Sequence, residues 1–164
     1  DTSFAVMAFV LLPIALVADV LDGAVARASG RKSPLGADLD SLADVISFGA
    51  APAMLAFALG VDGGWDALVL AFFVACGISR LARYNATADA LSDDSGKVKY
   101  YEGTPIPTSL ALVLMMGVAF HLGAIHEDLW FGSYMLGPLR FHPISLAYFV
   151  SGCAMVSTIR IPKP

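Results

Sequence analysis

Residues 19–44 read DVLDGAVARASGRKSPLGADLDSLAD and join two strongly apolar stretches of the chain. Asp19 and Asp22 are three residues apart, so they share one face of a helix. Asp40 and Asp44 are four residues apart and share one face of the next helix. Because the loop between these helices is short, the helices are expected to be antiparallel neighbours. Both carboxylate pairs should therefore converge at one depth.

The composition of the whole chain is that of a membrane protein. The chain has 164 residues, of which 57% are hydrophobic and 15% charged, and its mean hydropathy is +0.72. Several apolar runs approach the ~20 residues that cross a hydrocarbon core of about 30 Å. We predict an all-α polytopic membrane domain over residues 1–164, with five spans. Their expected bounds are 4–28, 37–59, 66–88, 104–122 and 142–159.

Charge patterning predicts the orientation of these spans. Nearly all lysines and arginines fall at or beyond one set of helix ends, and only Arg140 lies on the other side. By the positive-inside rule, the loops 29–36 and 89–103 and the C-terminus should face the cytosol. The formal net charge of −4 gives no electrostatic reason to expect a nucleic-acid partner. Gly49 and Pro52 interrupt the second span and are expected to bend it.

The four aspartates indicate a metal site. Two unit charges about 4 Å apart repel by roughly 4 kcal/mol at an effective dielectric of about 20, so four carboxylates need protons or cations beside them. An all-oxygen ligand set selects Mg²⁺ or Mn²⁺, and two such ions can clamp a pyrophosphate. Gly23 and Gly36 let a flat base or ribose approach the backbone. Arg27 supplies a guanidinium that can pair with phosphate.

The complete pattern is D-x2-D-G-x2-A-R-x8-G-x3-D-x3-D, which resembles the signature of the CDP-alcohol phosphotransferase family. The resemblance implies a two-metal site formed by Asp19, Asp22, Asp40 and Asp44. It also implies that Asp44 is the general base that deprotonates the acceptor hydroxyl. The CDP group would be bound by Asp22, Gly23, Ala26, Arg27 and Gly36. Family members usually have six spans and form homodimers, so one further span is expected before Asp1.

Stretches that overlap the end of the signature or follow it resemble the phosphatidylserine synthase group of this family, and its fungal members most of all. They are LDSLADVISFGAAPA (39–53), RLARYNA (80–86), YYEGTPIPTSLAL (100–112), FHPISL (141–146) and IPKP (161–164). The resemblance implies that CDP-diacylglycerol and L-serine are converted to phosphatidylserine and CMP. It further implies a location in the endoplasmic reticulum membrane, with the active site facing the cytosol.

The acceptor site is expected at the end of the third span. Arg80 and Arg83 are three residues apart and share a face, and Tyr84 and Asn85 follow directly. Two guanidiniums can hold the carboxylate of a free amino acid. The same arginines could instead bind inositol phosphate or glycerol 3-phosphate, or serve membrane topology alone.

Two other functions stay open. The same chemistry could use another acceptor, such as inositol, inositol phosphate or glycerol 3-phosphate. Alternatively, the aspartates could form the ion site of a cation-coupled transporter. A transport pathway should carry polar groups through the membrane depth, whereas the fourth and fifth expected spans are nearly free of charge. The sequence therefore favours an enzyme acting at one membrane surface.

Overall fold

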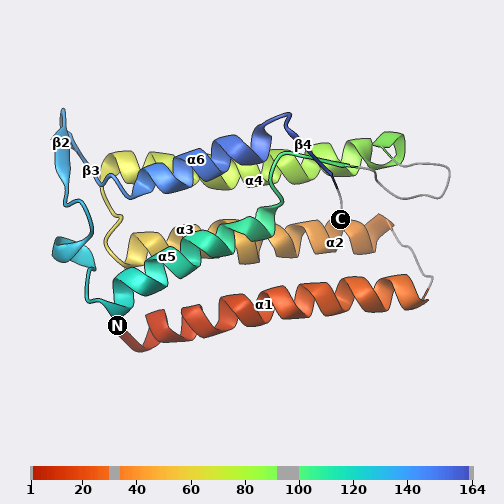
Figure 1. Cartoon of the computed structure of the whole chain (residues 1–164), viewed down its shortest axis with the longest axis horizontal. Helices are drawn as coiled ribbons and strands as arrows, with labels where there is room; N and C mark the ends of the chain where they lie inside the picture. Colours follow the sequence, from red (N-terminus) through yellow and green to blue (C-terminus); the bar gives the residue numbers. More distant parts are fainter. Residues whose placement is uncertain (1, 30–33, 92–99, 163–164) are drawn as a thin grey trace.

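The structure, a computed structural model, describes residues 2–29, 34–91 and 100–162. Its long helices run side by side along one axis (Figure 1). The helical elements are α1 (Thr2–Ser29), α2 (Pro34–Asp44), the π turn η1 (Val45–Ala50), α3 (Ala51–Ala58), α4 (Gly64–Leu91), the 3₁₀ turn η2 (Ile106–Ser109), α5 (Leu110–His121), the 3₁₀ turn η3 (His126–Asp128) and α6 (Ser145–Val156). Because α2, η1 and α3 follow without a break, the described chain has five helical segments, one at each expected span.

Three of these segments are long and apolar enough to cross a membrane. They are Ser3–Ala26, Leu35–Ala58 and Gly64–Ala86, whereas the apolar helices Ile106–His121 and Ser145–Val156 are shorter. The chain is therefore an integral membrane domain. The expected irregularity of the second span is confirmed, because Gly49 lies in the π turn and Pro52 in the first turn of α3. A π turn of this kind often marks a functional site.

The structure is mostly helical, as expected, but its connections also contain short strands. The strand β2 (Tyr134–Leu136) pairs with β3 (Leu139–Phe141), and β1 (Tyr100–Glu102) pairs with β4 (Arg160–Pro162), both antiparallel. The first pair turns through Gly137, whose φ of +65° suits glycine. The second pair joins segments far apart in the sequence. Three-residue strands are too short to give a readable alternating pattern.

Large side chains between α4, α6, α5 and η1 form the core. Phe73 and Tyr148 make an edge-to-face contact between α4 and α6, with ring centroids 5.4 Å apart. Ile106 is fully buried, and a methyl group on Gly77 would lie 2.9 Å from its Cδ1 atom. By contrast, only 6% of the α1 span is buried against the rest of the described chain, compared with 39% of the α4 span. Helix α1 is thus the least tightly packed wall of the bundle.

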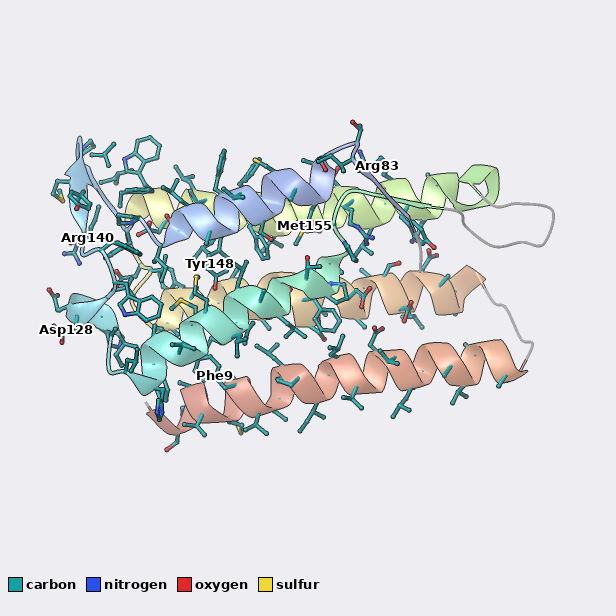
Figure 2. The ribbon with its side chains drawn as sticks, in the orientation of Figure 1. Phe9, Arg83, Asp128, Arg140, Tyr148 and Met155 are labelled. Carbon is teal, nitrogen blue, oxygen red and sulfur yellow. The ribbon has the colours of Figure 1, made fainter. Side chains whose placement is uncertain are left out.

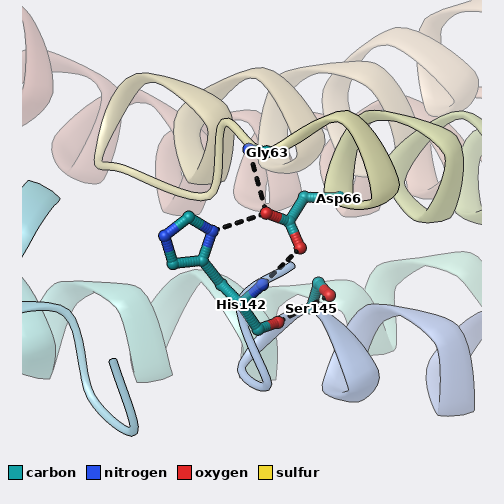
Figure 3. A network of polar contacts seen from close by, with 4 residues as sticks. All are labelled: Gly63, Asp66, His142 and Ser145. Atoms are coloured by element: carbon teal, nitrogen blue, oxygen red, sulfur yellow. Dashed lines mark hydrogen bonds and ion pairs between the residues drawn. The ribbon is translucent and has the colours of Figure 1, made fainter. Parts of the chain in front are cut away.

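A buried carboxylate joins the beginnings of α4 and α6 (Figure 3). Asp66 Oδ2 accepts a hydrogen bond from Gly63 N at 2.9 Å and contacts His142 Nδ1 at 2.5 Å, while Oδ1 accepts one from His142 N at 2.9 Å. Both side chains are buried. A buried carboxylate is tolerated only with such partners. His142 therefore has a structural role at this position.

Replacing Asp66 should destabilise the fold. The variant Asp66→Ala leaves buried N–H groups of Gly63 and His142 unpaired, so we expect a loss of about 3–5 kcal/mol in unfolding free energy. Thermal unfolding followed by circular dichroism in detergent measures this loss. Asp62→Ala, at an exposed position in the same connection, is the matched control and should melt close to the parent. Equal melting temperatures for the two variants would contradict the structural role.

Candidate active site

The two aspartate pairs lie at the same end of the bundle. Helix α1 carries Asp19 and Asp22 in its last three turns, and α2 carries Asp40 and Asp44 in its second half. In Figure 1 the end of α1 and the beginning of α2 lie at the same end of the molecule as the end of α4. Helix α2 begins at Pro34, and proline is a favoured residue at the first position of a helix. The structure thus brings both carboxylate pairs to one end of adjoining helices.

The four carboxylates form one electrostatic cluster. Asp44 interacts with the charges of Asp19 and Asp40, and also with Arg80 on α4. Asp19 in turn interacts with Asp40 and Asp22. Asp19 and Asp44 are half-buried, whereas Asp22 and Asp40 are exposed. The mutual repulsion of these carboxylates has to be offset by positive charge, either that of Arg80 or that of a bound cation.

The donor set fits a hard divalent cation in its chemistry. All four groups are carboxylates, which Mg²⁺ and Mn²⁺ prefer. Within the described ranges, however, no three His, Cys, Asp or Glu side chains stand close enough together to form a ready-made metal site. The aspartates are therefore a coupled cluster and not a closed coordination shell, and the two-ion site stays a prediction.

The two candidate acceptor arginines have different surroundings. Arg80 is only 7% exposed, and its guanidinium lies 5.9 Å from the centre of the Tyr84 ring. Arg83 donates hydrogen bonds to the carbonyls of Val156 and Ser157, at 3.3 and 3.2 Å, where α6 ends. Arg80 thus lies beside Asp44, whereas Arg83 also anchors the last turn of α6. Figure 2 labels Arg83 near that end of the helix.

A polar link joins α4 to α2 between the two aspartates of the second pair. Asn85 Nδ2 donates a hydrogen bond to Ser41 Oγ at 2.9 Å, and Ser41 Oγ donates to Ala37 O at 3.0 Å. Asn85 was expected at this site from the sequence, whereas Ser41 was not. The position of Ser41 between Asp40 and Asp44 was the sequence feature that could have identified it. The hydrogen bonds of Arg83 could not be predicted, because they go to backbone carbonyls more than 70 residues away and do not depend on a particular side chain there.

The residues expected to bind CDP lie on the same two helices. Gly23 is half-buried, and Asp22, Ala26 and Gly36 are exposed. Arg27 belongs to α1, but its side chain lies outside the described part of the structure. The exposed residues among them are accessible to a ligand from solvent. The assignment of these residues to CDP stays a prediction.

Known proteins resemble this chain over most of its length. The family profile described as CDP-alcohol phosphatidyltransferase matches residues 1–157. The chain is 49% identical to the CDP-diacylglycerol–serine O-phosphatidyltransferase of Saccharomyces cerevisiae, over 95% of this chain and 57% of that protein. It is 35% identical to the Helicobacter pylori enzyme of the same name (strain 26695), over 96% of this chain and 61% of that protein.

An archaeal relative also matches. The archaetidylserine synthase of Methanothermobacter thermautotrophicus is 38% identical over 74% of this chain and 49% of its own length. The chain thus spans roughly half to three fifths of the length of these relatives. With a family profile that covers nearly all its residues, the chain belongs to the CDP-alcohol phosphatidyltransferase family.

Proposed function

We propose that this chain is the catalytic membrane domain of an enzyme that transfers a phosphatidyl group from CDP-diacylglycerol to L-serine. The observation that carries the proposal is the cluster of four signature carboxylates at one end of α1 and α2, coupled to the buried Arg80. The names of these relatives support serine as the acceptor, since two are serine phosphatidyltransferases and one is an archaetidylserine synthase.

The reaction needs a base close to the acceptor hydroxyl. We assign this role to Asp44, which is half-buried at the junction of α2 and the π turn. The serine oxygen bonds to the diacylglycerol-linked phosphorus, the bond from that phosphorus to CMP breaks, and the hydroxyl proton passes to Asp44. Divalent cations, when bound by Asp19, Asp22, Asp40 and Asp44, supply charge neutralisation for the pyrophosphate.

Arg80 is the best-supported acceptor residue. A buried guanidinium favours a carboxylate partner over water, and Asp44 lies within its electrostatic reach. Serine held by its carboxylate at Arg80 would present its hydroxyl toward Asp44. Tyr84 stacks near the guanidinium, and Asn85 fixes α4 against α2. Arg83 completes the proposed acceptor set, with its contacts to α6 as a second role.

The membrane arrangement extends the proposal. We infer that all five helical segments belong to one domain, residues 1–164, and span the membrane, with a sixth span elsewhere in the protein. The aspartate end would face the cytosol, because the basic residues gather at that end. Two Mg²⁺ or Mn²⁺ ions, a homodimer and the endoplasmic reticulum membrane complete the proposal, and they rest on the family resemblance.

The proposed activity is tested by acceptor-dependent release of CMP. The purified protein, in detergent with Mn²⁺ or Mg²⁺, receives CDP-diacylglycerol and one acceptor at a time: L-serine, inositol or glycerol 3-phosphate. We expect release with serine and little with the other two. Release with another alcohol would keep the reaction and reject the acceptor, whereas no release from folded protein with any acceptor would reject the enzyme.

Removal of the proposed base gives a sharper test. Asp44→Asn keeps the size of the side chain but cannot take a proton at neutral pH, so serine-dependent turnover should fall by about 10²–10⁴-fold. The matched control is Asp38→Asn, an exposed aspartate on the same helix outside the signature, which should stay active. Thermal melting checks that both variants fold. Turnover of Asp44→Asn within a few-fold of the parent would reject the base assignment.

A further inference from the structure

The end of the bundle opposite the aspartates carries an exposed apolar hairpin. It consists of β2, β3 and the preceding residues from Phe131 onward. Its exposed large side chains are Phe131 (73%), Tyr134 (58%), Met135 (70%), Leu136 (51%) and Leu139 (37%). A contiguous apolar patch on a connecting loop usually marks a surface that meets a partner or a membrane.

Tight packing fixes the depth of this hairpin relative to a membrane-spanning helix. Trp65, in the first turn of α4, donates a hydrogen bond from Nε1 to Leu136 O at 2.9 Å. A methyl group on Gly64 would lie 2.6 Å from Leu139 Cδ2, so the strand rests directly on the first residue of α4. The candidate span begins at that same residue, Gly64. The hairpin therefore lies at the depth where the span begins.

The hairpin lies across the end of the bundle. In Figure 1 its turn projects beyond α4 and α6. Register places Tyr134 opposite Phe141 and Leu136 opposite Leu139, so these apolar side chains share one face. Met135, itself exposed, lies on the other face across from Arg140, so both faces of the hairpin carry exposed apolar side chains. An element with this shape would meet lipid at the side of the bundle.

We propose that residues 131–141 insert into the headgroup–acyl boundary of the leaflet opposite the aspartate end. Continuity selects lipid as the occupant, because the exposed patch adjoins, through Trp65, the first turn of a helix long and apolar enough to cross a membrane. Tryptophan and tyrosine favour this boundary, where their rings are in apolar surroundings and their polar groups stay hydrated. Arg140 has a stem long enough to extend toward lipid phosphates. The inference does not depend on the proposed reaction.

Site-directed spin labelling tests the insertion. Cys76 and Cys153 are replaced by Ala, and Met135→Cys carries a nitroxide in the full protein, reconstituted in phosphatidylcholine vesicles. Collisions with oxygen, which concentrates in the membrane, are compared with collisions with a water-soluble nickel chelate. We expect oxygen to dominate at position 135. The control is Asp128→Cys in η3, an exposed position in the same connection, where nickel should dominate.

Two outcomes overturn the proposal. Dominant nickel collisions at position 135 would place the hairpin in water, and weak collisions with both reagents would place it under protein, including a second copy of the chain.

A second measurement covers variants that fail to fold. In Trp130→Phe protein with its cysteines intact, lipids brominated near the headgroup should quench the Trp65 emission more than lipids brominated near the chain ends. Equal or absent quenching would also reject insertion.

Discussion

Four like charges held at one end of two adjoining helices are the constraint on which the site depends. Asp19 and Asp22 on α1 interact with Asp40 and Asp44 on α2, and the coupling reaches Arg80 on α4. Such a cluster is destabilising unless positive charge joins it. A divalent cation and the pyrophosphate that it neutralises are a chemical solution to this repulsion. In the proposed site, binding of a cation would relieve this repulsion, and the bound cation would in turn attract the pyrophosphate.

Two of the helices around these charges differ in how tightly they pack: α4 is held firmly, and α1 is packed loosely. Helix α4 packs against α6 through Phe73 and Tyr148, and the buried Asp66–His142 contact fixes their beginnings. At its other end α4 carries Arg80 and, through Asn85, holds α2 beside the second aspartate pair. Helix α1 is buried far less. An approach of α1 toward α2 would therefore be the least costly way to close a coordination shell.

Sequence patterns reveal long apolar helices and charge spacing well, and they reveal distant polar contacts poorly. The five helical segments and the irregularity at Gly49 follow from hydropathy and from glycine and proline positions. The β2–β3 hairpin could not be predicted, because three-residue strands are too short to show an alternation of apolar and polar residues. The contacts of Ser41 and Asp66 could not be predicted, because their partners, Asn85 and His142, lie far away in the sequence. Helix spacing predicted a shared carboxylate face, but it could not give the separation of α1 from α2.

The central claim is that carboxylates from both helices bind cations as one unit, and Mn²⁺ binding tests it most directly. Electron paramagnetic resonance measures free Mn²⁺ during titration of the parent protein, Asp19→Asn, Asp44→Asn and the double variant. Each single change should weaken Mn²⁺ binding by roughly tenfold or more, the scale on which changes near metal ligands act. The double variant should lose much less than the sum of the two losses, because the residues share one site. Additive losses, or an unchanged affinity in either single variant, would contradict the account.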